Sequence, residues 1–115
     1  MNNTRQSLYE GMYILSATLS EDARKKALDK ILDGITEKGG SIRKVLEIGR
    51  RKLAYTIEKR REGYYYLIYF NIIPSAISHL WEEYQLHEDL LKYMTSCCSE
   101  ADILESFEFK PLKQS

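Results

Sequence analysis

The sequence predicts an α+β domain in which two helices cover one face of a four-stranded antiparallel sheet. Four segments alternate with a period of two and two segments have helical periodicity, in the order βαββαβ. Each helical segment has one apolar side, which must be buried against the sheet. The chain has 115 residues, a length that suits a single core. Together these observations indicate the ferredoxin-like arrangement.

The first strand is expected over residues 9–17 and the first helix between Ser20 and Gly39. In the strand "YEGMYILSA", apolar side chains occur on both faces, which is typical of a central strand. Ser20 is a candidate N-cap, and the two acidic residues after it favour the helix dipole. The pair Gly39-Gly40 is a suitable helix stop.

The second and third strands are expected to form a long hairpin over residues 42–58 and 63–72. In the second strand, the apolar residues are even-numbered up to Ile48 and odd-numbered from Leu53. A change of parity needs one extra residue, and Gly49 lies at the change. We therefore predict a β-bulge or bend at Gly49.

The second helix is expected to open at Pro74 and to be followed by a last strand over residues 90–97. The apolar stripe of this helix consists of Ile77, Leu80, Trp81 and Tyr84. Residues 1–7 are assigned to an N-terminal extension and residues 99–115 to an acidic, flexible C-terminal tail without a regular element. The folded domain is thus expected to span residues 8–98.

Positive charge is concentrated in the middle of a chain that carries no net charge. Residues 43–61 hold eight basic and two acidic side chains, whereas residues 62–115 hold three basic and nine acidic ones. A local patch of this kind attracts polyanions even on a neutral protein, because screening limits its field to about 10 Å. We predict a nucleic-acid-binding surface, rather than scattered solvated charges, formed by Arg50, Arg51, Lys52, Lys59, Arg60 and Arg61.

The aromatic third strand invites comparison with the RNA-recognition motif, whose third strand stacks bases. That function would require Tyr64 and Tyr66 to face away from the helices. However, the even-numbered side chains between positions 63 and 72 are the more apolar set and should face the helices. Base stacking on Tyr64 and Tyr66 is therefore not expected.

The opposite face of the sheet is also apolar, and such a patch often marks a protein interface. We predict a protein-partner surface formed by Met12, Ile14, Tyr65, Leu67 and Tyr69. The alternative is that the C-terminal tail covers this face, through Phe107 and Phe109. A self-associating module that stacks two open faces is a further alternative.

Other functional classes find little support in the sequence. An acylphosphatase-type enzyme needs an arginine in the loop after the first strand, but residues 16–20 are "SATLS". His79, His87 and the adjacent pair Cys97-Cys98 lack the usual zinc spacings. We predict no catalytic residue, no metal, no cofactor and no small-molecule substrate. The N-terminus has no apolar targeting segment, so a cytoplasmic location without membrane contact is expected.

A motif of the form G-x-[RK]-[RK]-L-A-Y-x-I-x-K precedes a Gly-Tyr strand in this chain. The residues concerned are Gly49, Arg51, Lys52, Leu53, Ala54, Tyr55, Ile57, Lys59, Gly63 and Tyr64. With Tyr9-Glu10, they resemble the bacterial small-subunit ribosomal protein six family over about residues 8–98. The resemblance implies a ferredoxin-like, non-enzymatic protein of the cytoplasmic ribosome. It also implies binding to small-subunit (16S) ribosomal RNA and pairing with small-subunit ribosomal protein eighteen.

Overall fold

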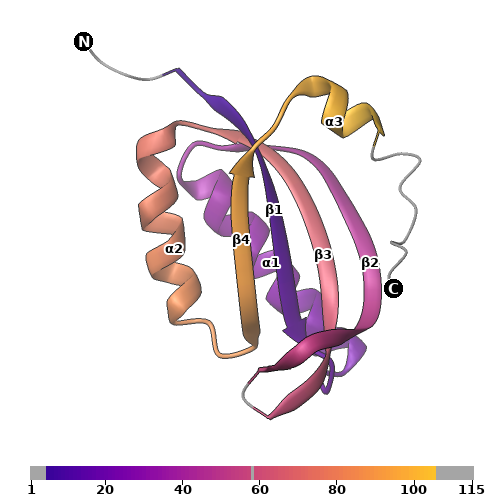
Figure 1. Cartoon of the computed structure of the whole chain (residues 1–115). Helices are drawn as coiled ribbons and strands as arrows, with labels where there is room; N and C mark the ends of the chain where they lie inside the picture. The colour runs from indigo at the N-terminus through magenta and orange to yellow at the C-terminus, as the bar shows by residue number, and fades with distance from the viewer. Residues whose placement is uncertain (1–4, 58, 106–115) are drawn as a thin grey trace.

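Four strands form one antiparallel sheet in the order β2-β3-β1-β4 (Figure 1). The structure is a computed structural model that describes residues 5–57 and 59–105. The strands are β1 (Ser7–Ser16), β2 (Ser41–Ile57), β3 (Arg60–Ile72) and β4 (Leu90–Cys97). The two central strands, β1 and β3, each pair with a neighbour on both sides. The predicted ferredoxin-like fold is confirmed.

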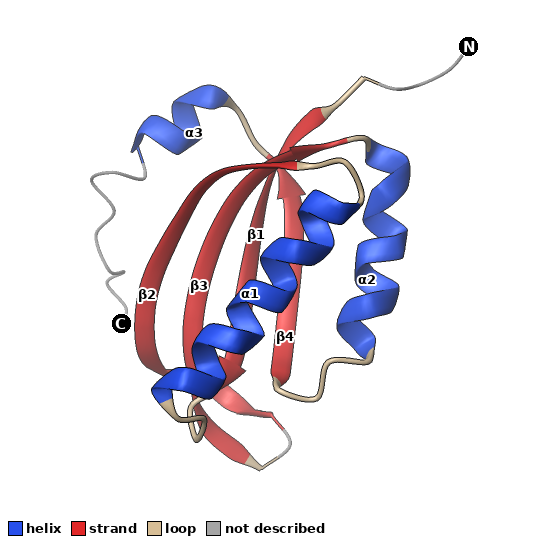
Figure 2. Cartoon of the chain, turned by 180° about the vertical axis from the view of Figure 1, so that it is seen from behind, coloured by secondary structure: helices blue, strands red, loops and turns tan. Residues whose placement is uncertain are grey.

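Two helices cover one face of the sheet, as Figure 2 shows from behind. They are α1 (Glu21–Glu37) and α2 (Ile77–Gln85), the latter preceded by a 3₁₀ turn, η1 (Pro74–Ala76). Ser20 is the predicted N-cap: its Oγ accepts a hydrogen bond from the backbone N–H of Ala23 at 3.1 Å. At the other end of α1, Gly39 has a φ of +87°, a conformation that favours glycine. None of the described helices is long and apolar enough to cross a membrane.

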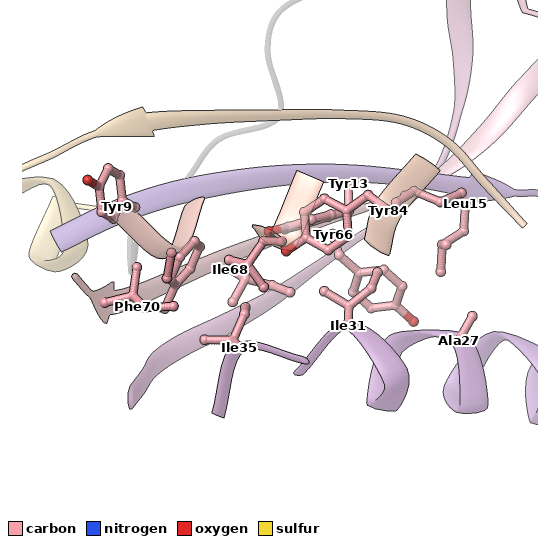
Figure 3. Packing of buried hydrophobic residues seen from close by; sticks show 14 residues of the cluster. Tyr9, Tyr13, Leu15, Ala27, Ile31, Ile35, Tyr66, Ile68, Phe70 and Tyr84 are labelled. Atoms are coloured by element: carbon pink, nitrogen blue, oxygen red, sulfur yellow. Dashed lines mark hydrogen bonds between the residues drawn. The ribbon is translucent and has the colours of Figure 1, made fainter. Parts of the chain in front are cut away.

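The hydrophobic core lies between the sheet and these two helices (Figure 3). The even-numbered residues Tyr66, Ile68 and Phe70 of β3 are buried on this side. The predicted parity of β3 is therefore confirmed. Tyr9, Tyr13 and Leu15 of β1 lie beside them in the sheet. The residues that face them from the helices are Ala27, Ile31, Ile35, Leu80 and Tyr84.

A buried hydrogen bond joins the centre of the sheet to α2. The hydroxyl groups of Tyr13 and Tyr84 lie 2.9 Å apart, and their rings meet edge to face at 5.4 Å. Burial raises the pKa of Tyr84 to about 12 and the pKa of Tyr13 well above its usual value. Both phenols therefore stay neutral at physiological pH, and each partner satisfies the other.

Strand β2 contains three register shifts along β3, at Ile42/Lys44, Glu47/Gly49 and Lys52/Ile57, of which the sequence predicted one. The pairing advances by one residue between Glu47 and Gly49, and Gly49 has a φ of +103°. This confirms the predicted bulge. A second shift, between Ile42 and Lys44, was not predicted. It places Ile42 against the helix-side core but Leu46 on the opposite face.

The C-terminal segment differs from the prediction because it contains a short helix, α3 (Glu100–Glu105). A reciprocal capping arrangement starts this helix. The Ser99 N–H donates to the Asp102 carboxylate at 2.8 Å, and the Asp102 N–H donates back to the Ser99 hydroxyl at 3.3 Å. Phe107 and Phe109, the predicted covering residues, lie outside the described residues.

We expect Tyr13→Phe and Tyr84→Phe each to lower the free energy of unfolding by about 1–2 kcal/mol, because each leaves one buried hydroxyl without its partner. The double variant should cost less than the sum of the two single variants, because it removes both hydroxyls together. Urea unfolding of the wild type and the three variants measures these differences. Strict additivity would contradict a direct Tyr13–Tyr84 interaction.

Candidate nucleic-acid interface

The β2–β3 hairpin extends beyond the sheet and bends across its end (Figure 1). We call its outer part, residues 50–57 and 59–62, the hairpin arm. Near its tip, the hydroxyl of Tyr55 accepts a hydrogen bond from Lys92 Nζ at 2.9 Å, and this ammonium lies 5.3 Å from the centre of the Tyr55 ring. Lys92 belongs to β4, the opposite edge strand, so the arm reaches across the open face of the sheet.

The absence of a side chain at Gly63 allows the base of the arm to lie directly against Ile14 of β1. A Cβ atom at this position would lie 2.3 Å from Cγ2 of Ile14 and 3.4 Å from Cδ2 of Leu53. Ile14 is only 3% exposed although it lies on the open face. The arm therefore covers this end of β1, and only glycine leaves enough room for the contact.

The structure places all six predicted RNA-binding residues on the hairpin arm. Arg50, Arg51, Lys52, Lys59 and Arg61 are exposed, and Arg60 is half-buried. Within the part of the chain that the structure describes, Lys52, Lys59 and Arg61 form no ion pair. The arrangement presents several cationic groups to solvent on one narrow ribbon, a geometry that suits contact with phosphates.

Two of the six arginines and lysines also hold the arm in place. Arg50 pairs with Glu62 at 2.9 Å and donates to the carbonyl oxygen of Ala17 at 3.4 Å. Arg60 donates to Oγ of Ser16, which is buried at the end of β1. These bonds fix the arm against the β1–α1 loop. Arg50 and Arg60 thus have a structural role in addition to the predicted one.

Two other cations at the start of β2 point to α3 instead. Arg43 forms two hydrogen bonds with the carboxylate of Glu100, at 2.8 and 3.1 Å. Lys44 Nζ donates to the carbonyl oxygen of Ile103 at 3.3 Å. Arg43 and Lys44 therefore hold α3 and lie outside the hairpin arm.

Tyr64 and Tyr66 lie on the helix side and already have partners. The guanidinium of Arg24 lies 3.8 Å from the ring centre of Tyr64, and its Nε donates to the Tyr66 hydroxyl at 3.3 Å. These contacts, the Tyr66 hydrogen bond foremost, raise the pKa of Arg24. The Tyr64 hydroxyl donates to Glu47. Arg24 therefore occupies one face of the Tyr64 ring, and this face is closed to base stacking.

Arg24 and Lys92 belong to the site although the sequence analysis did not single them out. Each contacts an aromatic ring that is far away in the chain, on the hairpin. A lone arginine on a helix and a lone lysine on a strand carry no local signal of such a contact. Only the packing of α1 and the bending of the hairpin bring these pairs together.

The predicted partner surface is divided between buried and half-buried residues. Leu67 and Tyr69 are 8% and 2% exposed and pack against Ile103 of α3. Met12 and Tyr65 are half-buried, and Met94, which pairs with Met12 from β4, is 53% exposed. Self-cover by the C-terminal segment therefore occurs over part of this face, through α3.

A hollow of about 320 Å³ lies beside α3 on the open face. Its walls are formed by Glu10, Leu67, Tyr69, Cys97, Cys98, Asp102 and Glu105. Burial, with a smaller effect of the nearby carboxylates, raises the pKa of Cys98 to about 11. Such a thiol stays protonated and reacts slowly near neutral pH. Among the described residues, no group of three or more histidine, cysteine or acidic side chains could hold a metal ion.

Comparison with known proteins points to one family. Residues 8–96 match the family model described as Ribosomal protein S6. The chain is 56% identical to the small ribosomal subunit protein bS6 of Protochlamydia amoebophila (strain UWE25), over 99% of this chain and 98% of that protein. It is 59% identical to the protein of the same name from Chlamydia pneumoniae, over 83% of this chain and 85% of that protein.

A solved structure shows the same similarity in three dimensions. The crystal structure of 30S ribosomal protein S6 from Thermotoga maritima superposes with a TM-score of 0.79 at 28% sequence identity. The superposition covers 90% of this chain and 98% of that chain. The two proteins therefore share one fold over almost the whole of this chain, although their sequence identity is only 28%.

We expect Gly63→Ala to lower the free energy of unfolding by about 1–3 kcal/mol, because the added methyl group collides with Ile14 and pushes the hairpin arm away from β1. Gly39→Ala is the control: its Cβ meets nothing within 4 Å, so only the backbone cost at a φ of +87° remains, about 1 kcal/mol. Chemical denaturation measures both. If Gly63→Ala were as stable as the wild type, the close approach of the arm to β1 would be wrong.

Proposed function

Because the chain belongs to the ribosomal protein S6 family, we propose that it binds 16S ribosomal RNA through the hairpin arm and pairs with small-subunit ribosomal protein eighteen through the open face of its sheet. Membership of this family gives the chain a structural role in the small subunit of the cytoplasmic ribosome. The family is not an enzyme family. The RNA and protein contacts are the proposed part of the function.

The exposed cations of the hairpin arm are the observation that carries the RNA proposal. Arg51, Lys52, Lys59 and Arg61 lie on both strands and the turn of one ribbon. A ribbon of this width can follow a phosphate backbone, because its cations are a few ångströms apart along the strands. Each phosphate that is neutralised releases counterions, so binding should be strongly salt-dependent and largely independent of base sequence.

The anchoring of the arm supports this assignment. Arg50 and Arg60 tie the arm to the β1–α1 loop, and Lys92 ties its tip to β4. A ribbon held at both positions loses little conformational entropy when it binds, since it is already ordered. The exposed cations are therefore presented at fixed positions rather than on a mobile loop.

The protein-partner proposal rests on the apolar character of the open face. Met12 and Tyr65 are half-buried, and the neighbouring Met94 and Tyr55 are largely exposed. Large apolar and aromatic side chains gathered on one face of a small domain are typical of the core of an interface. The predicted residues Ile14, Leu67 and Tyr69 are more deeply buried in the chain on its own. For these three, the partner role remains a prediction.

The alternative functions differ from this proposal in measurable ways. A self-associating module would stack two open faces, and sedimentation would then show a dimer at low micromolar concentration. An acylphosphatase-type enzyme needs an arginine in the loop after β1, and residues 16–20 contain none. Arg50 and Arg60 do reach this loop, but they are occupied by Glu62, Ala17 and Ser16. The family assignment favours the ribosomal function over both.

We expect the triple variant Arg51→Ala, Lys52→Ala, Arg61→Ala to weaken binding of a 16S ribosomal RNA fragment by the complex with small-subunit ribosomal protein eighteen. The slope of log K against log salt should fall by about 2–3, because about 0.9 is lost for each phosphate contact. Filter binding at several salt concentrations measures this slope. The variant keeps Arg50 and Arg60, so the arm stays anchored.

The matched control removes the same charge from α1, on the helix side of the sheet. The variant Lys25→Ala, Lys26→Ala, Lys30→Ala changes three exposed lysines of α1, and its salt slope should equal that of the wild type. An equal fall in both triple variants would mean that overall charge, rather than the hairpin arm, determines RNA affinity.

We expect Met12→Ser and Tyr65→Ser each to weaken binding to small-subunit ribosomal protein eighteen about tenfold, because each removes apolar area from the proposed interface. Leu86→Ser is the control, since Leu86 is 82% exposed at the end of α2, away from the open face. Titration calorimetry with the purified partner measures the three affinities. Wild-type affinity in both open-face variants would show that the partner binds elsewhere.

A further inference from the structure

Helix α3 covers part of the surface to which the protein partner is assigned. Its only buried side chain, Ile103, packs against Leu67 and Tyr69, two of the predicted partner residues. Leu46 of β2 and Cys98 also contact this cluster. The next residue of the helix, Leu104, is 66% exposed. The helix thus contributes one apolar anchor to the open face.

Polar bonds at the edge of the sheet complete the attachment of α3. Arg43 of β2 holds the Glu100 carboxylate with two bonds and also donates to the side-chain oxygen of Asn71 at 3.0 Å. Lys44 Nζ donates to the backbone oxygen of Ile103 at 3.3 Å. The Glu100 side chain is 68% exposed, so water competes for its two bonds with Arg43.

These contacts give α3 only a small energetic advantage in its covering position. A helix of six residues is too short to be stable by itself in water. Exposed ion pairs such as Arg43–Glu100 contribute little to stability. Among the described residues, the burial of Ile103 and its part-buried bond with Lys44 are the main remaining contributions. A segment held in this way opens at a low cost compared with the strands beneath it.

Removal of α3 would change the shape of the partner surface. In its covering position, α3 separates Leu67 and Tyr69 from solvent, whereas Met12 and Met94 on the neighbouring strands stay accessible. The register pairs Met12 with both Leu67 and Met94. Without α3, these side chains would form one continuous apolar surface across β3, β1 and β4.

We propose that α3 is a displaceable cover: it competes with small-subunit ribosomal protein eighteen for Leu67 and Tyr69, and the partner binds the full open face after α3 has moved. This inference rests on the proposed function, because it concerns the same surface and the same partner. In the isolated chain, the cover hides two apolar residues that would otherwise be exposed. In the complex, the partner takes the place of Ile103.

The test compares Ile103→Ser with Leu104→Ser in the full chain. Both remove a branched apolar side chain from the same helix, but only Ile103 is buried against the sheet. If α3 is a cover, Ile103→Ser increases the affinity for purified small-subunit ribosomal protein eighteen about tenfold, because the apparent affinity scales with the uncovered fraction. Leu104→Ser does not increase it. An unchanged or lower affinity of Ile103→Ser overturns the inference.

A second measurement follows the cover without the partner. Cys98 is half-buried against the cluster around Ile103, whereas Cys97 is exposed. In a Cys97→Ser background, alkylation reports on Cys98 alone, and its rate should rise severalfold in Ile103→Ser but not in Leu104→Ser. If the rate is the same in all three chains, Ile103 does not hold α3 in place and the inference is wrong.

The two proposals fail in different ways. If Met12→Ser and Tyr65→Ser weaken the complex but Ile103→Ser does not strengthen it, the partner surface is correct and the cover is wrong. If Ile103→Ser weakens the complex, α3 belongs to the binding surface and does not compete with it. If none of these substitutions changes the affinity, the partner does not use the open face, and both proposals are wrong.

Discussion

Strand β3 is apolar on both faces, and the rest of the fold depends on how each face is covered. On one face, Tyr66, Ile68 and Phe70 are buried by α1 and α2, which form the main core. On the other face, Leu67 and Tyr69 also need a cover, which α1 and α2 do not supply. The hairpin arm and α3 each cover one end of this second face. Both attachments therefore follow from one property of the central strands β1 and β3: apolar residues occur on both of their faces.

The need to cover the apolar open face also explains why the cations of the arm have fixed positions. Because the arm must cover Ile14, it crosses the end of the sheet and is anchored there by Arg50, Arg60 and Lys92. Its outer surface then carries the remaining cations away from the domain. A surface that recognises RNA by charge needs cations in defined positions but few base contacts. Packing and the proposed RNA recognition thus use the same short ribbon.

The sequence predicted those features that local alternation determines. The parity of β3 and the bulge at Gly49 could be read from the order of apolar residues, because each face of a strand is set by a period of two. The shift between Ile42 and Lys44 could not, since both possible faces of β2 are apolar in places. The contacts of Arg24 with Tyr64 and of Lys92 with Tyr55 join distant segments, so no local pattern reports them. The start of helix α3 could have been predicted from Ser99 and Asp102, which form a capping pair. The helix itself is too short to show helical periodicity.

The two covers of the open face differ in strength, and this difference suggests a division of tasks. The arm is continuous with two long strands, and a glycine at position 63 fits it tightly against Ile14. Its displacement would break strand pairing, which is costly. Among the described residues, helix α3 is joined to the sheet through one buried apolar side chain, an exposed ion pair and a part-buried Lys44 bond, so its displacement costs less than that of the arm. An assembly protein must hide its apolar interface before it meets its partner and expose it afterwards. A weak cover on one end of the face and a permanent one on the other satisfy both needs, because the proposed site of RNA contact stays ordered while the proposed site of protein contact opens.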